Sequence, residues 1–266
     1  MIARSVYLLA GPTSSGKTAA AAVLARRMGA AVLSADSMLV YKGFDIGTAK
    51  PSPSEREGYE LGGIDLETPD RPFSAGAWLR AASRFASALP PEKPLIVAGG
   101  TGLYFSALLR GLDRPWLDPP PACPFLELPR DVLRERARER IENMFAAGWA
   151  AEVAEMSRRF PVWSQTASFA IGYAEIRDSF SFPPGTDPVP PPEPGFSEMK
   201  ERILLRTMRL AKHQRTWFRH QTRPVPVVPA ASPADTADAV AATWRETGPA
   251  EGLFPEPGDP GMEERT

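Results

Sequence analysis

The sequence has almost no cysteine, no long apolar run and almost no net charge. Cys123 is the single cysteine, which excludes an internal disulfide and a zinc site built from cysteines and favours a reducing, cytoplasmic location. No apolar run approaches 18 residues and no signal-peptide pattern precedes the first apolar segment, so we expect neither a membrane span nor a leader. The formal net charge is −1, and any surface that binds nucleic acid must therefore be local.

Residues 11–18, GPTSSGKT, fit the phosphate-binding pattern G-x-x-x-x-G-K-[ST]. They follow the apolar run 6–10 and precede the helix-forming run 19–28, which is the strand, loop and helix order of a P-loop. The predicted phosphate-binding residues are Gly11, Pro12, Thr13, Ser14, Ser15, Gly16, Lys17 and Thr18. Backbone N–H groups and Lys17 would bind a diphosphate or triphosphate, with Thr18 holding Mg²⁺. A glycine turn that only joins a strand to a helix is the alternative, and the Lys-Thr pair disfavours it.

The P-loop sets the expected fold. With 266 residues and 43% apolar content, we expect a single α/β domain over 1–228, with helices on both faces of a parallel sheet of the P-loop kinase type and a reduced helical appendage. The 30 prolines are clustered, and they predict a bridge over 115–124, a linker over 183–195 and a C-terminal tail over 229–266. In the tail we expect one short helix, about 234–245, and then disorder.

Two polar residues follow apolar runs that we expect to be parallel strands. Asp36 comes after the run 30–33, and Thr101 comes after the run 94–98 and two glycines. Carboxyl ends of parallel strands share the ligand edge of a sheet, so both are site candidates. Asp36 could instead cap a helix or bind a metal as a Walker B acid, and Thr101 could cap a helix. The strand before Thr101 ends without an acid, which disfavours ordinary ATP hydrolysis.

Other segments predict a functional loop and further helices. Residues 41–51 have no clear period, which is typical of a long ordered loop over the sheet edge. We expect a helix after Ser74, two helices over 130–147 and 149–159, one helix over 165–180 and an edge strand over 225–228. The interleaved Arg and Glu residues of 130–147 are typical of a solvated helix face.

The segment 197–220 predicts a basic helix. Its positive residues form stripes at helical spacing beside Trp217 and Phe218, a pattern that suits an RNA backbone and stacked bases. From this segment we expect RNA contacts by Arg206, Arg209, Lys212 and Arg215. The alternative is a surface helix that buries its apolar residues and leaves its arginines in water.

Six motifs, in this order, resemble the bacterial tRNA dimethylallyltransferases, also called tRNA isopentenyltransferases. They are GPTSSGKT, SADS, YKGFDIGTAKP, GGTGLY, FAIGYAE and RLAKHQRTWFR. The resemblance covers 5–111 almost continuously and 128–223 more loosely. It implies a prenyltransferase that moves a dimethylallyl group from dimethylallyl diphosphate to the exocyclic N6 amine of the adenosine 3′ of the anticodon, with Mg²⁺ as cofactor. The implied partner is the tRNA anticodon stem-loop, and we expect a cytoplasmic monomer.

The resemblance also implies roles for residues. The P-loop would hold the diphosphate and magnesium, Asp36 would accept the proton of the amine, Thr101 would contact the diphosphate bridge, and Arg140 would neutralise the leaving group. Asp36, Ser37, Met38 and Leu39 would contact the tRNA. Arg140 is singled out by the resemblance alone.

The chain departs from the family in three places. Only a proline-rich bridge stands between Leu112 and Leu128, where the family usually carries a helical insertion that grips the tRNA. Gly62-Gly63 stand where two histidines are common, and Met208 stands where arginine is usual. Three alternative functions therefore stay open: prenylation of a free adenine nucleotide, a non-catalytic nucleotide- or RNA-binding relative, and a small-molecule kinase.

Overall fold

The computed structural model describes residues 5–110 and 121–250. Six parallel strands form one sheet in the order β3-β2-β4-β1-β5-β6. The strands are β1 Val6–Ala10, β2 Ala31–Ala35, β3 Leu61–Gly62, β4 Leu95–Gly99, β5 Ala122–Leu126 and β6 Arg223–Val227. The central strands β1, β2 and β4 read as continuous apolar runs because both faces of a parallel sheet are covered. The predicted parallel α/β sheet is confirmed.

The register of the three central strands sets the position of the loops that follow them. Ala10 of β1 and Ala35 of β2 both pair with Gly99 of β4, so these strands end at the same level. At Gly99 a Cβ atom would lie 2.2 Å from the Ala35 carbonyl oxygen, and only glycine fits there. The P-loop, Asp36 and Thr101 therefore all leave the sheet at one edge, as the sequence predicts.

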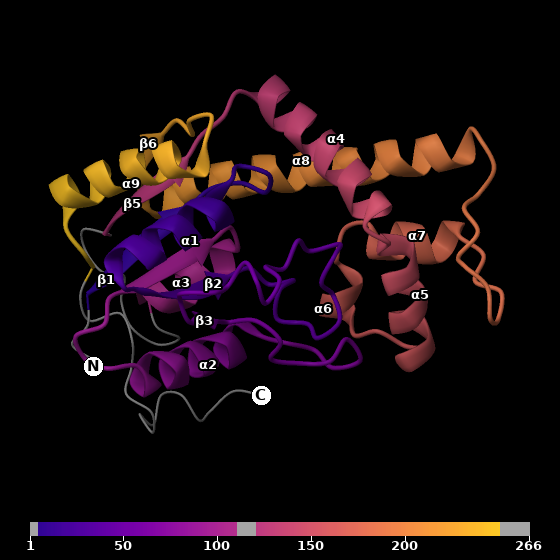
Figure 1. The fold of residues 1–266 in the computed structure, drawn as a ribbon, viewed down its shortest axis with the longest axis horizontal. Helices are drawn as coiled ribbons and strands as arrows, with labels where there is room; N and C mark the ends of the chain where they lie inside the picture. The colour runs from indigo at the N-terminus through magenta and orange to yellow at the C-terminus, as the bar shows by residue number, and fades with distance from the viewer. Residues whose placement is uncertain (1–4, 111–120, 251–266) are drawn as a thin grey trace.

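Helices cover both faces of the sheet (Figure 1). They are α1 Lys17–Met28, α2 Ala75–Ala88, α3 Gly102–Arg110, α4 Arg130–Ala146, α5 Trp149–Arg159, α6 Gln165–Ser168, α7 Tyr173–Ser179, α8 Gly195–Gln221 and α9 Pro233–Thr247. On one face, α1 and α9 pack on Leu9 and Ile96. On the other, α2, α3 and α8 pack on Leu8 and Val97. Alternate strand residues thus serve two separate cores.

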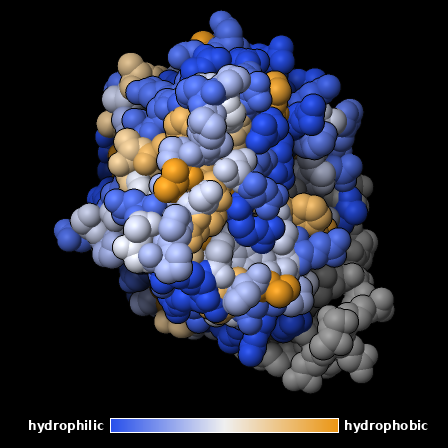
Figure 2. All heavy atoms as spheres, turned by 90° about the vertical axis from the view of Figure 1, so that its right-hand side faces the viewer, coloured by the Kyte–Doolittle hydropathy of each residue, from blue (hydrophilic) through white to orange (hydrophobic). Residues whose placement is uncertain are grey.

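The long helix α8 joins the sheet to the helical part of the molecule. In Figure 1 it runs from the region of α3 and β6 past α4 to α7. Figure 2 views this helical end, where hydrophobic residues are scattered among hydrophilic ones. Within residues 5–110 and 121–250, no helix combines the length and the apolar character that a membrane crossing requires.

Three expectations about segments are corrected. Cys123 and Pro124, expected in the 115–124 bridge, belong to β5, which pairs with β6 at the edge of the sheet; residues 111–120 lie outside the described residues. The predicted helix 165–180 is two helices, α6 and α7, since Gly172 has φ 92° between them. The helix expected near 234–245 is α9, but it packs against α1 instead of extending as a tail. Residues 251–266 are not described.

Candidate active site

The P-loop presents unpaired donors around a buried lysine. Ser14 and Gly16 have left-handed φ angles of 64° and 89°, which turns the chain around a concave backbone. The N-cap Gly16 makes no side-chain cap hydrogen bond in the described structure, so the first N–H groups of α1 are available to an anion. The Ser14 and Ser15 hydroxyls are also buried without a partner among the described residues. Buried polar groups are normally satisfied, and a bound phosphate would satisfy these.

A cavity of about 380 Å³ brings the P-loop together with distant residues. It is lined by residues 13–19 and by Asp36, Leu39, Thr48, Ala49, Arg136 and Arg140, among others. The structure therefore places Lys17, Thr18, Asp36 and Arg140 around one space, although the last of these is more than a hundred residues away in sequence. A second cavity, of about 910 Å³, shares Ala49, Pro51, Glu55, Arg136 and Arg140 with the first.

Arg140 is held between two loops. Its Nη1–H donates to Thr13 Oγ1 of the P-loop at 3.3 Å, and its Nη2–H donates to the Thr48 carbonyl oxygen at 3.1 Å. Burial lowers the pKa of Arg140, and the nearby Asp36 carboxylate opposes this. The solvated-face interpretation of this helix is thus wrong at Arg140, which turns toward the cavity.

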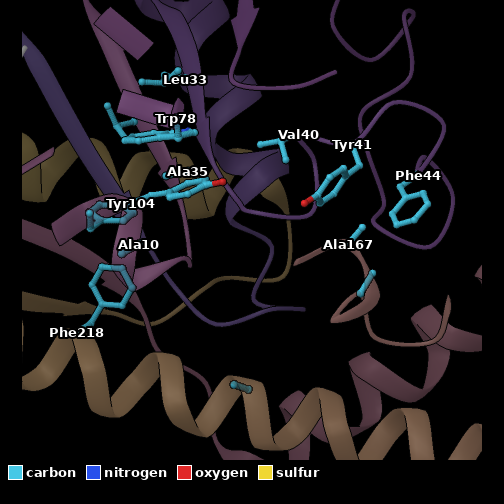
Figure 3. Close-up of a cluster of buried hydrophobic side chains, with 14 of the residues drawn as sticks. Ala10, Leu33, Ala35, Val40, Tyr41, Phe44, Trp78, Tyr104, Ala167 and Phe218 are labelled. Carbon is cyan, nitrogen blue, oxygen red and sulfur yellow. The ribbon is translucent and has the colours of Figure 1, made fainter. Parts of the chain in front are cut away.

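Asp36 begins a turn, not a helix. Its Oδ1 accepts the Met38 N–H at 3.0 Å, and residues 37–40 form bends and a turn, so the helix-cap interpretation is wrong. The loop that follows Asp36 is anchored by buried side chains. Figure 3 shows three of them, Val40, Tyr41 and Phe44, in the hydrophobic core cluster. Asp36 thus lines the cavity from an anchored loop.

A protein-family model described as IPP transferase matches residues 39–123 and 118–221. The chain therefore belongs to the IPP transferase family. Two curated relatives are tRNA dimethylallyltransferases. The one from Methylococcus capsulatus is 30% identical over 91% of this chain and 92% of its own; the one from Synechococcus sp. (strain JA-3-3Ab) is 31% identical over 80% and 79%. A crystal structure of a tRNA delta(2)-isopentenylpyrophosphate transferase from Staphylococcus epidermidis has the same fold, with a TM-score of 0.74 and 22% identity over 91% of this chain and 99% of that one.

In this IPP transferase, the shortened insertion between Leu112 and Leu128 stays a prediction. The alignment to the Methylococcus relative extends over 316 positions, whereas this chain has only 266 residues, so that relative has residues with no counterpart here. The two matched stretches of the family model meet at 118–123, inside the segment where we expected the insertion to be missing.

Thr101 and Ser37 contact each other. The Thr101 hydroxyl accepts the Ser37 N–H at 2.9 Å and donates to Ser37 Oγ at 3.3 Å. Thr101 is not among the described residues that line the first cavity. Its hydroxyl thus holds the loop that begins at Asp36 and makes no side-chain cap bond to α3 among the described residues, while its contact with the diphosphate stays a prediction.

The predicted basic stripes of α8 divide into two kinds of residue. Arg206 forms an ion pair with the largely buried Glu175, and Arg215 donates to the Leu128 carbonyl oxygen at 3.2 Å. These two bind neighbouring elements of this IPP transferase. Arg209 and Lys212 are exposed, while about a third of the Arg206 and Arg215 side chains is exposed, and RNA contact by these four residues stays a prediction.

Gln214 of α8 was not among the predicted site residues. It is 9% exposed, and its Oε1 accepts the Thr13 N–H of the P-loop at 2.9 Å. A Cβ atom on Gly100 would lie 2.4 Å from its Nε2, so it also packs on the loop after β4. One signal in the sequence could have identified Gln214 as a site residue. It is a polar residue at helical spacing between Ala211 and Phe218, on the apolar face of the helix.

The binding of inorganic diphosphate should weaken as the pH rises above about 8. Burial lowers the pKa of Lys17 to about 8, with Asp36 opposing and Arg140 adding to the effect. Below that pH Lys17 is protonated and attracts an anion; above it the charge is lost, at about tenfold in affinity per pH unit until the pKa of the complex is reached. Calorimetric titrations from pH 6 to 10 would measure this.

Lys17→Arg is the matched control for that titration. Arginine stays charged throughout this range, and comparison with it also removes the effect of diphosphate's own ionisation. If wild type and Lys17→Arg show parallel pH dependence, Lys17 does not lose a charge that binds the anion between pH 6 and 10.

Proposed function

We propose that this protein transfers a dimethylallyl group from dimethylallyl diphosphate to the exocyclic N6 amine of the adenosine 3′ of the anticodon in tRNA. The observation that carries the proposal is the single cavity shared by Lys17, Asp36 and Arg140 beside the P-loop. Its lining combines an anion-binding loop with cationic side chains and the Asp36 carboxylate, which are the groups that this displacement needs. Membership in a family whose curated relatives are named tRNA dimethylallyltransferase supports it.

The reaction breaks a carbon–oxygen bond and forms a carbon–nitrogen bond. As the allylic carbon leaves oxygen, negative charge builds on the diphosphate. Lys17, Arg140 and the N–H groups of the P-loop are placed to stabilise that charge. Asp36 would orient the amine and accept its proton as the new bond forms. Its second carboxylate oxygen is suited to this role, because Oδ1 already accepts the Met38 N–H.

At this site a magnesium ion would be bound by the phosphates of the ligand and by one hydroxyl of the protein. Within the described residues, no group of three His, Cys, Asp or Glu side chains could hold a metal by itself. Mg²⁺ commonly takes substrate phosphates and waters as most of its ligands, and Thr18 lines the cavity next to the P-loop. Thr18 would therefore hold the ion, which when bound would neutralise charge on the diphosphate.

The acceptor would contact the protein through two surfaces. The first is the segment Asp36, Ser37, Met38 and Leu39, which leads from the cavity. The second is the exposed pair Arg209 and Lys212 on α8. Because the insertion is shortened, affinity should depend mainly on the anticodon stem-loop. We expect the protein to act as a monomer in the cytoplasm.

Transfer of label from dimethylallyl diphosphate tests the proposal. The protein would be incubated with Mg²⁺, labelled dimethylallyl diphosphate and either unfractionated tRNA or AMP. Label in tRNA, mapped to the nucleotide 3′ of the anticodon, is the expected result. Label in AMP alone would replace the acceptor with a free nucleotide, and no label with ATP turnover instead would overturn the proposal.

Neutralising Arg209 and Lys212 together should flatten the salt dependence of tRNA binding. Removing one cation that binds a phosphate should reduce the slope of log affinity against log salt by about 0.7–0.9. The double variant Arg209→Gln/Lys212→Gln should therefore have a slope smaller by about 1.5, which filter binding at several salt concentrations would measure. Arg245→Gln, an exposed arginine on α9, is the control for the loss of a surface positive charge away from α8. An unchanged slope in the double variant would show that α8 does not contact the RNA backbone.

A further inference from the structure

Glu152, in the first turn of α5, accepts four hydrogen bonds. Its Oε2 accepts the N–H groups of Asp45 and Ile46 at 3.0 and 2.7 Å, and its Oε1 accepts the Gly47 N–H at 3.2 Å and the Tyr173 O–H at 2.5 Å. Three successive backbone N–H groups that converge on one point form an anion-binding nest. Here the anion is a side chain of the protein itself, and it fixes residues 45–47.

The same loop is packed tightly against α5 and α7. A Cβ atom on Gly47 would lie 2.0 Å from Nε1 of Trp149 and 2.6 Å from the ring of Tyr173, so only glycine allows this approach. Phe44 stacks on Tyr173 with 4.0 Å between ring centroids. Burial and the Glu152 carboxylate raise the pKa of Tyr173 well above its usual range, so its hydroxyl remains a donor to that carboxylate.

The residue after this nest touches the active site. Thr48 Oγ1–H donates to the Phe44 carbonyl oxygen at 2.5 Å, and the Thr48 carbonyl oxygen accepts from Arg140. Arg140 also donates to Thr13 of the P-loop. A planar guanidinium bonded at two of its nitrogens has a defined orientation. One of the two anchors is the P-loop, and the other is the backbone that Glu152 holds.

We propose that Glu152 is a positioning residue for Arg140, acting through the backbone of residues 45–48. The inference rests on the proposed function, in which Arg140 stabilises the departing diphosphate. If the nest opens, the Thr48 carbonyl moves and Arg140 loses its second anchor. A displacement of about 1 Å in a catalytic group can cost on the order of 10²-fold in rate. Glu152 itself lines neither of the two described cavities and would not touch substrate.

Glu152→Gln should lower the single-turnover rate about 10- to 100-fold. Glutamine keeps the size of the side chain, but its NH₂ group must face at least one of the three backbone N–H groups, which opens the nest. The diagnostic measurement is a double-mutant cycle with Arg140→Ala. If Glu152 acts through Arg140, Glu152→Gln should cause almost no further loss of rate in the Arg140→Ala background. Additive losses in the two backgrounds would overturn the proposal.

Two further variants serve as a control and as a second test of the proposal. Glu155→Gln, on the same helix and in an exposed pair with Arg158, should keep the wild-type rate. Tyr173→Phe removes one bond from the carboxylate and leaves the three N–H bonds, so it should cost about tenfold or less and show the same non-additivity with Arg140→Ala. It replaces Glu152→Gln if that variant does not fold. A wild-type rate for Glu152→Gln would also overturn the proposal.

Binding of inorganic diphosphate tests the role of Glu152 independently of the proposed transfer reaction. The same cycle, measured by calorimetry, should show that Glu152→Gln weakens binding only where Arg140 is present. A wild-type protein that transfers no dimethylallyl group would contradict the proposed function, whereas the calorimetric cycle would still confirm or contradict the role of Glu152.

Discussion

Asp36→Asn should lower the single-turnover rate of dimethylallyl transfer on the order of 10²–10⁴-fold, with diphosphate and RNA affinity almost unchanged. The lone pair of an adenine amine is delocalised into the ring, so attack requires a group that orients the N–H and takes the proton. Asparagine keeps the Oδ1 atom that accepts the Met38 N–H, and the turn should therefore survive. It replaces only the oxygen that would accept the proton.

The pH of this measurement matters because Asp36 supports the charge of Lys17. The Asp36 carboxylate raises the pKa of Lys17 against the effect of burial, so its loss should move that pKa below about 8. Rates should be compared at several pH values below 8, so that loss of the Lys17 proton in the variant would show as a fall in rate with rising pH. Asp238→Asn, on the surface of α9 in a pair with Arg27, is the matched control. A variant that loses diphosphate or RNA affinity but keeps its bound-state rate would assign Asp36 to binding.

Arg140→Ala should lower the rate of the bound complex about 10²–10³-fold, the usual effect of removing one donor to developing negative charge. The structure gives a reason for a large effect: Arg140 is held in place by the protein itself, through Thr13 and Thr48. A preorganised donor requires no reorganisation during the reaction. Rapid-quench measurement at saturating dimethylallyl diphosphate would separate this rate from affinity.

Arg138→Ala provides the comparison on the same helix. Arg138 is exposed and pairs with Glu135 one turn away, so its loss should leave the rate within about twofold. If Arg140→Ala raises only the concentration of dimethylallyl diphosphate needed for saturation, Arg140 binds the ground state and does not preferentially stabilise the leaving group.

The parts of the site that the sequence predicts are those encoded locally. The P-loop and the loop at Asp36 each follow an apolar run, and the register of β1, β2 and β4 brings their ends together. Arg140 could be found only by resemblance, because the repeating Arg and Glu residues of α4 do not show which arginine faces inward. Its partners, Thr13 and Thr48, lie 127 and 92 residues away.

The same limit explains what the sequence does not show. Charge spacing makes Arg206 and Arg215 resemble their neighbours on α8, and it does not reveal that Glu175 and the Leu128 carbonyl oxygen bind them from other elements. Glu152 was not among the predicted site residues, since its three backbone donors come from a loop more than a hundred residues earlier. Such pairings depend on tertiary structure, and no local period encodes them.

The packing of α9 on α1 has a consequence for synthesis of the chain. Trp244 of α9 donates its Nε1–H to the carbonyl oxygen of Leu8 in β1, 236 residues away, and it lies with Val240 against Leu24 of α1 in one core. At about 5–20 residues per second, a ribosome needs roughly 10–50 s to pass from one to the other. Throughout that time the apolar face of α1 has no cover from α9. The helix α1 is thus among the first elements made and the last to be covered, and a chain released early would expose its apolar face to chaperones and proteases.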